Sequence, residues 1–146
     1  MNILVINGPN LNLLGTRETD VYGTDTLEEL MMWLENSPEA AGHSFKFYQS
    51  NHEGEIIDSI HDEREWAEGI IINPAAFTHT SVALLDALRS LDKPKIEIHL
   101  SNIYNRENYR KNSITASGVN GMICGFGHLS YILAIEALNN LLNNGK

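Results

Sequence analysis

Short apolar segments alternate with segments of helical periodicity along the whole of this 146-residue chain. The helical segments place apolar side chains at i, i+3, i+4 and i+7, which indicates helices with one buried face. Clear examples run over residues 27–34, 84–91 and 131–142. The apolar segments, which indicate buried strands, cover residues 3–6, 45–48, 70–72, 96–98 and 119–123. The pattern therefore predicts a repeating order of strand and helix with five strands.

Strand–helix alternation at this length is typical of a parallel sheet that is covered by helices on both faces. Parallel neighbours in such a sheet are joined by right-handed crossovers. We therefore predict an α/β protein of the flavodoxin-like type, with a five-stranded parallel sheet in the order 2-1-3-4-5. The length fits one domain that spans residues 1–146.

Several residues mark the expected helix ends. Thr26 and Glu29 have the spacing of a capping box before the first helix. Ser50 or Asn51 is the expected cap of a weaker helix around residues 56–60, and Pro94 is expected to end the third helix.

Charge and cysteine content limit the classes of partner. The formal net charge is −9, so the long-range field repels nucleic acid and anionic membranes. Cys124 is the only cysteine, which excludes an intrachain disulfide, and no apolar run reaches transmembrane length. We expect a cytoplasmic protein without nucleic-acid or membrane partners. An anionic substrate would need a local cluster drawn from the five arginines.

Polar residues follow the first, third and fourth predicted strands. They fill residues 7–23, 73–81 and 99–110. With the order 2-1-3-4-5 these three strands are neighbours, so their loops open onto one cleft at the carboxyl edge of the sheet. The cleft would gather a tyrosine, two histidines, several asparagines and three arginines, which favours acid–base chemistry.

The connection after the first strand is long for an α/β unit. Residues 11–23 contain Gly15 and Gly23 at positions where a lid could hinge. Tyr22 and Arg17 would move together on this lid. A tyrosine can act as a base near neutral pH only when a neighbouring positive charge stabilises its phenolate, and Arg17 is a candidate for that charge. His99, at a strand end, suits the role of proton donor.

Five sequence blocks occur in order along the chain. They read GPNLNLLGTRE (8–18), VYG (21–23), QSNHEG (49–54), INPAAFTHTS (72–81) and HLSN (99–102). Together they resemble the signature blocks of the type II 3-dehydroquinases, and the similarity covers nearly the whole chain. Several blocks at the family's spacing are far more specific than one short motif.

The resemblance implies an enzyme that removes water from 3-dehydroquinate by anti elimination, through an enolate, to give 3-dehydroshikimate in the shikimate pathway. It implies no cofactor. Tyr22 matches the family's base, Arg17 the residue that activates it, and His99 the acid. Asn10 matches a residue that holds a water or donor at the enolate oxygen.

The resemblance also implies a set of substrate-binding residues and an assembly. The binding positions are Asn73, His79, Arg110 and the backbone N–H groups of Leu100 and Ser101, together with Asp86 from a neighbouring subunit. The family forms dodecamers built from trimers, so a homo-oligomer of that kind is expected here.

Other interpretations compete with these. A Schiff-base mechanism needs a desolvated lysine, and none of the five lysines is well placed for the predicted cleft. A flavodoxin-like module that only binds an anion is also possible from the fold alone. Arg106 can equally be a solvated residue on a helix face, and His79 a helix cap. Metal-ligand spacing such as HExxH and the nucleotide loop GxGxxG are both absent, so we predict no metal and no nucleotide cofactor.

Overall fold

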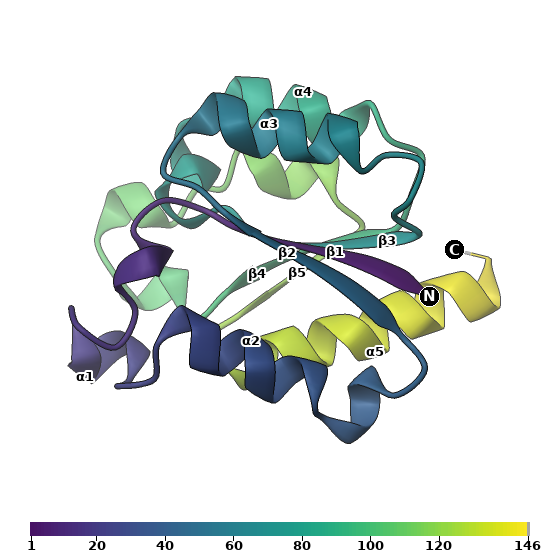
Figure 1. Cartoon of the computed structure of the whole chain (residues 1–146). Coiled ribbons are helices and arrows are strands. Elements are labelled where there is room, and N and C mark those ends of the chain that lie inside the picture. The colour runs from purple at the N-terminus through teal and green to yellow at the C-terminus, as the bar shows by residue number, and fades with distance from the viewer. Residues whose placement is uncertain (146) are drawn as a thin grey trace.

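The computed structural model describes residues 1–145 and contains one five-stranded parallel sheet (Figure 1). The strand order is β2-β1-β3-β4-β5, which confirms the predicted flavodoxin-like arrangement. The strands are β1 (Asn2–Asn7), β2 (Ser44–Gln49), β3 (Gly69–Asn73), β4 (Lys95–His99) and β5 (Gly121–Cys124).

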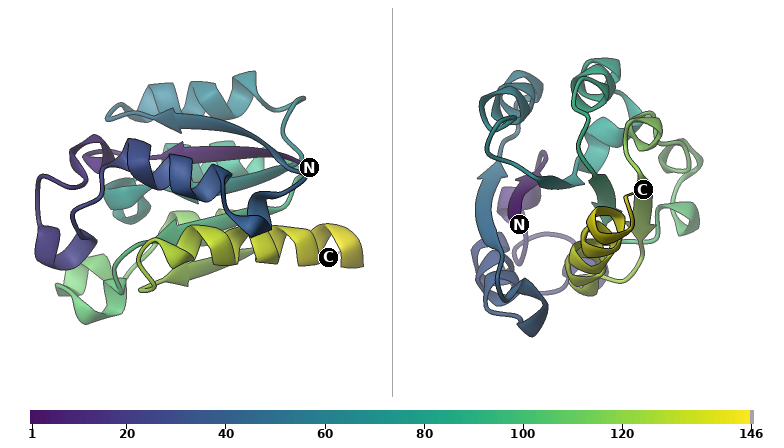
Figure 2. Two further views of the ribbon diagram at one scale, coloured as in Figure 1. Left: turned by 60° about the horizontal axis from the view of Figure 1, so that its bottom comes forward. Right: turned by 90° about the vertical axis from the view of Figure 1, so that its right-hand side faces the viewer.

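Helices cover both faces of the sheet, as predicted. The α-helices are α1 (Thr19–Tyr22), α2 (Leu27–Glu35), α3 (Glu53–Asp62), α4 (Val82–Arg89) and α5 (Leu129–Asn144). α3 and α4 lie on one face, and α2 and α5 lie on the other (Figures 1 and 2). No helix in residues 1–145 is long and apolar enough to cross a membrane.

Two apolar cores result from the alternation of side chains along each strand. In β1, Ile3 and Val5 belong to the core beside α2 and α5, whereas Leu4 and Ile6 belong to the core beside α3 and α4. A strand that is buried on both faces reads as a continuous apolar run. This is why β1 and β3 stand out so clearly in the sequence.

The helix ends agree only partly with the predictions. The Thr26 hydroxyl accepts from the backbone N–H of Glu29, as its spacing indicates. The N-cap of α3 is His52, one or two residues later than expected, because the Ser50 hydroxyl accepts from the N–H of His52. α4 ends at Arg89, so Pro94 does not terminate it and instead lies directly before β4.

The connection between β4 and β5 contains no α-helix, which corrects the regular alternation predicted from the sequence. It consists of three 3₁₀ segments, Ile103–Asn105, Asn108–Arg110 and Thr115–Gly118. This stretch is rich in asparagine and serine and has no apolar stripe that could anchor a longer helix. β5 accordingly begins at Gly121 and not at Val119.

The carboxyl ends of β1 and β3 are held unusually close together. Asn7 and Asn73 are register partners, and the N–H of Gly8 donates to the carbonyl of Asn73 at 2.8 Å. A β-carbon on Gly8 would lie 2.5 Å from the carbonyl oxygen of Pro74, so only glycine fits. The two polar loops that leave these strands are therefore side by side.

Candidate active site

A pocket opens at the carboxyl ends of β1, β3 and β4, at the place where the predicted cleft was expected. Nine of the ten residues predicted to act in catalysis or binding line it. These are Asn10, Arg17, Tyr22, Asn73, His79, His99, Leu100, Ser101 and Arg110. The tenth, Asp86, is exposed on α4 and lies outside this pocket.

Tyr22 points its hydroxyl at an arginine on the far side of the pocket. Nη1 of Arg106 donates to the Tyr22 hydroxyl at 2.7 Å, and the guanidinium carbon lies 5.7 Å from the centre of the tyrosine ring. The Arg106 side chain is only 16% exposed. It is thus a pocket residue, which overturns its reading as a solvated residue on a helix face.

Arg17 also lines the pocket, but its guanidinium is engaged elsewhere. Its Nη2 forms an ion pair with the carboxylate of Glu18. Glu18 has φ of 44°, and this left-handed turn sets the direction of the chain before α1. The positive charge that we expected beside Tyr22 therefore comes from Arg106 in this structure and not from Arg17.

His99 forms a buried pair with an acid that sequence reasoning missed. Its Nε2 lies 2.7 Å from Oε1 of Glu97, and the two side chains are 6% and 0% exposed. Burial alone raises the pKa of the Glu97 carboxyl, but hydrogen bonds from His99, Thr78 and Thr115 outweigh burial and lower it. Glu97 precedes His99 by two residues on β4, so both side chains lie on one face of the strand.

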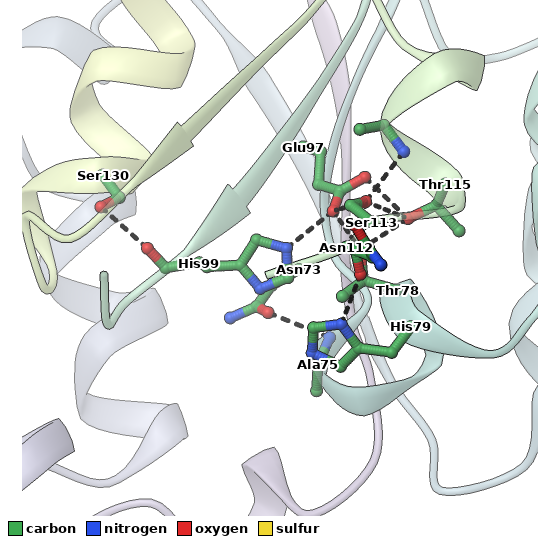
Figure 3. Close-up of polar contacts among 11 residues, drawn as sticks. Asn73, Ala75, Thr78, His79, Glu97, His99, Asn112, Ser113, Thr115 and Ser130 are labelled. Carbon is green, nitrogen blue, oxygen red and sulfur yellow. Dashed lines mark hydrogen bonds and ion pairs between the residues drawn. The ribbon is translucent and has the colours of Figure 1, made fainter. Parts of the chain in front are cut away.

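Three hydroxyl groups surround the carboxylate of Glu97 (Figure 3). They belong to Thr78, from the 3₁₀ segment after β3, and to Ser113 and Thr115, from the connection before β5. A buried carboxylate without such donors would destabilise the fold, because its charge would be removed from water without compensation. The sequence contained one signal for this arrangement, because a glutamate inside an otherwise apolar strand needs buried partners.

The remaining polar residues line other parts of the pocket. Nδ1 of His79 lies 2.7 Å from the carbonyl oxygen of Asn112, which fixes the ring on the loop that follows Arg110. The Asn73 side-chain oxygen accepts from the N–H of Ala75. Asn10 adopts a left-handed conformation with φ of 68°. Nε of Arg110 donates to Glu107 at 2.8 Å.

No lysine of residues 1–145 lines this pocket. Lys95 is buried, but it stands at the opposite end of β4, where Nζ donates to the carbonyls of Leu91 and Lys93. Lys46 pairs with Glu63 on the outer part of the sheet. Within the same residues, no cluster of three or more His, Cys, Asp or Glu side chains could hold a metal ion.

Fold and pocket together define a flavodoxin-like α/β protein with a polar pocket between the carboxyl ends of β1, β3 and β4. The pocket is lined by a tyrosine whose hydroxyl contacts a guanidinium and by a histidine that pairs with a buried glutamate behind it.

Comparison with known proteins gives the family. The family model described as "Dehydroquinase class II" matches residues 1–139. The chain is 52% identical over 145 residues to the 3-dehydroquinate dehydratase of Clostridium botulinum (strain Loch Maree), covering 99% of each protein. It is 48% identical to 3-dehydroquinate dehydratase 1 of Agrobacterium fabrum, with 95% and 96% covered. The crystal structure of a type II dehydroquinase from Butyrivibrio crossotus superposes with a TM-score of 0.92 at 47% identity, over 95% of this chain and 97% of that one. The chain belongs to the class II dehydroquinase family.

Proposed function

We propose that this chain dehydrates 3-dehydroquinate to 3-dehydroshikimate by anti elimination, without a cofactor, in the shikimate pathway. One observation carries most of the proposal. A tyrosine whose hydroxyl contacts a guanidinium faces the same pocket as a buried His–Glu pair, and the two come from different strand ends. An elimination needs such a base and such an acid on one substrate.

Tyr22 is the proposed base. As a phenolate it removes the proton from the carbon next to the substrate's carbonyl, and the electrons move into an enolate. The guanidinium of Arg106 donates to the phenolic oxygen at 2.7 Å and so places a positive charge beside the proposed base. Arg17, on the same loop as Tyr22, is proposed to add positive charge when the lid closes.

His99 is the proposed acid for the second step. It donates a proton to the hydroxyl that leaves from the β-carbon as the enolate collapses, so water departs and a conjugated enone remains. Because Nε2 of His99 is engaged by Glu97, Nδ1 is the ring nitrogen left for the substrate. Asn10 is proposed to hold a water or a donor at the enolate oxygen.

Binding of the substrate's carboxylate and hydroxyls is assigned to the rest of the pocket. The proposed contacts are Asn73, His79, Arg110 and the backbone N–H groups of Leu100 and Ser101. These donors outweigh the repulsion that a net charge of −9 exerts on an anion.

The unit of activity is proposed to be an assembly of copies of this chain, each folded as one domain over residues 1–146. Asp86 is exposed on α4, away from its own pocket, which fits a residue that completes the pocket of a neighbour. We propose a dodecamer built from trimers, working in the cytoplasm.

The test is absorbance of the conjugated enone after 3-dehydroquinate is added to wild type and to Tyr22→Phe. Product from wild type, with normal binding but no turnover by Tyr22→Phe, supports the dehydratase and its base. A folded, assembled wild type that only binds would instead indicate an anion-binding module. Inactivation by borohydride in the presence of substrate would reveal a Schiff-base lysine and contradict the proposed mechanism.

A further inference from the structure

The carboxylate of Glu97 is saturated with hydrogen-bond donors. Oε1 faces the hydroxyls of Thr78 and Ser113, the latter at 3.0 Å, and also Nε2 of His99 at 2.7 Å. Oε2 accepts from the Thr115 hydroxyl at 2.7 Å. Glu97, Thr78 and Thr115 are all 0% exposed, so no bulk water supplements these contacts.

The hydrogen bonds of these hydroxyls and of the His99 ring favour one of the two protonation states of Glu97. An ionised carboxylate only accepts hydrogen bonds. The three hydroxyls also contact one another, at 2.6 Å between Thr78 and Ser113 and at 2.8 Å between Thr78 and Thr115, so they share their protons between Glu97 and the set itself. A protonated Glu97 would become a donor itself, and one hydroxyl would have to turn its proton away. The Ser113 hydroxyl already accepts from the N–H of Ala116, which leaves its own proton for Glu97 or Thr78. The hydrogen bonds from His99, Thr78 and Thr115 lower the pKa of the Glu97 carboxyl despite its burial, so the set favours the anion.

An anion at this place matters because the pocket is otherwise positive. Arg17, Arg106 and Arg110 line it together with Tyr22 and His79, while Glu18 and Glu107, outside the lining, pair with these guanidinium groups. Glu97, 2.7 Å from the His99 ring, is the negative charge that pairs with His99 itself. If Glu97 took up the Nε2 proton, His99 would be left as a neutral imidazole, whose remaining N–H is too weakly acidic to protonate the leaving hydroxyl.

We propose that Thr78, Ser113 and Thr115, here named the hydroxyl cradle, are positioning residues that keep Glu97 an ionised acceptor, so that the exchangeable proton stays on His99. This inference rests on the proposed role of His99 as the acid. None of the three residues lines the pocket, so the cradle acts only through Glu97.

The cradle also ties the acid to a binding loop. Thr78 follows β3, whereas Ser113 and Thr115 follow Arg110 on the connection to β5. The N–H of Ile114 donates to the carbonyl of Thr78 at 2.6 Å, which locks the two segments together. A backbone contact therefore brings the hydroxyls of the cradle to Glu97, and side-chain variants of Thr115 leave that contact in place.

The test compares Thr115→Val, which keeps the shape but removes the donor, with the matched control Thr115→Ser, which keeps the hydroxyl. In Thr115→Val we expect kcat at its pH plateau to fall about tenfold or more, because part of the general-acid contribution is lost, while KM changes by less than about twofold. The high-pH limb of kcat should move to higher pH. This shift follows because the singly protonated pair can move its proton from His99 to Glu97 and so tolerate the missing donor, whereas the deprotonated pair always contains ionised Glu97.

A direct readout is the ¹⁵N NMR signal of the His99 ring at neutral pH. In Thr115→Val it should move from imidazolium towards neutral imidazole, and in Thr115→Ser it should stay with wild type. Ser113→Ala, at a half-buried position with a longer contact, should show a smaller shift in the same direction, and it provides the test if Thr115→Val does not fold.

Unchanged ring-nitrogen signals in both Thr115→Val and Ser113→Ala would overturn the cradle, even if kcat fell, because the loss would then be structural. A failure of the proposed function can be distinguished from a failure of the cradle. If wild type made no product, the dehydratase would be wrong, while the ring-nitrogen comparison would still decide whether the cradle holds the proton on His99.

Discussion

The positive charge in contact with Tyr22 belongs to Arg106, which lies 84 positions away in sequence. Arg17, only five residues away on the same loop, does not make this contact. The sequence shows both arginines but not the path of the loop between them. That path depends on the left-handed turn at Glu18, whose carboxylate also captures Arg17. The sequence therefore predicts which residue types line the pocket more easily than it predicts which of them contact each other.

The contact of Arg106 with Tyr22 predicts a loss of turnover in Arg106→Gln. We expect kcat to fall on the order of a hundredfold, since a preorganised charge on a developing anion is removed. Steady-state kinetics with 3-dehydroquinate measures this. Arg64→Gln is the matched control, because Arg64 is exposed and remote from the pocket, and it should retain wild-type kcat. Wild-type turnover in Arg106→Gln would show that Tyr22 does not depend on this guanidinium.

Glu97 shows what sequence reasoning leaves out at the residue scale. Tyr22 and His99 could be singled out because they stand in polar blocks that resemble a known family. Glu97 lies inside a strand that reads Ile-Glu-Ile-His, and the sequence there indicates only a buried strand. Its function as a partner of His99 depends on hydroxyls from two distant segments, and their convergence cannot be read from spacing.

At the scale of elements, the strands and the helices with apolar stripes were predictable because burial imposes their periodicity. The connection between β4 and β5 was not. It is held by polar contacts such as those of Ser113 and Thr115 with Glu97, and such contacts leave no periodic trace in the sequence. The same holds for α3, whose start at Glu53 depends on the local bond between His52 and Ser50.

The proposed lid after β1, residues 11–23, is predicted to need glycine at position 15. Gly15 has φ of +86°, and a β-carbon there would lie 2.7 Å from the carbonyl oxygen of Thr24. Gly15→Ala should displace the lid that carries Tyr22 and lower kcat/KM about tenfold to a hundredfold. Gly42→Ala is the control, since Gly42 has φ of +81° but open space around it and lies away from the pocket.

Backbone strain alone, about 1 kcal/mol, is common to both glycine variants. Kinetics with 3-dehydroquinate and limited proteolysis of the lid separate strain from displacement. Equal kinetics and equal cleavage in Gly15→Ala and Gly42→Ala would contradict a specific need for glycine at the base of the lid.

The link between β2 and α3 gives a prediction about pH and stability. Hydrogen bonds from Lys46 and Tyr48, both on β2, lower the pKa of Glu63 at the end of α3. A lowered pKa in the folded state means that this stability is present above the ordinary value of about 4.5 and is lost as pH falls through the folded value.

Glu63→Gln should therefore lower the free energy of unfolding at pH 7 by about 0.5–1 kcal/mol, discounted because Lys46 is partly exposed. Near pH 3 the difference from wild type should shrink. Urea unfolding at the two pH values measures it, with Glu65→Gln, at a fully exposed site, as the control. A difference that is the same at both pH values would show that the charge of Glu63 is not what stabilises the link.

On the scale of the whole molecule, positive charge is concentrated at the pocket, although the chain as a whole is negative. The net charge is −9, yet three of the five arginines line one pocket. α4 carries Asp86 on an exposed face together with Val82, an aliphatic side chain that is 57% exposed four residues earlier. A carboxylate beside an exposed apolar residue on one helix face is suited to contact with another copy of the chain.

If Asp86 completes a neighbour's pocket, two inactive variants should restore activity to each other. Asp86→Ala keeps an intact Tyr22 but lacks the carboxylate that it would lend, whereas Tyr22→Phe keeps Asp86 but lacks the base. In an assembly formed by refolding equal amounts together, about a quarter of the pockets combine an intact Tyr22 with a neighbour's intact Asp86. Activity should therefore rise to about a quarter of wild type.

Light scattering must first show that each variant assembles like wild type. A well-assembled mixture without activity would mean that Asp86 serves no neighbouring pocket, because a residue acting within its own chain cannot be supplied by another.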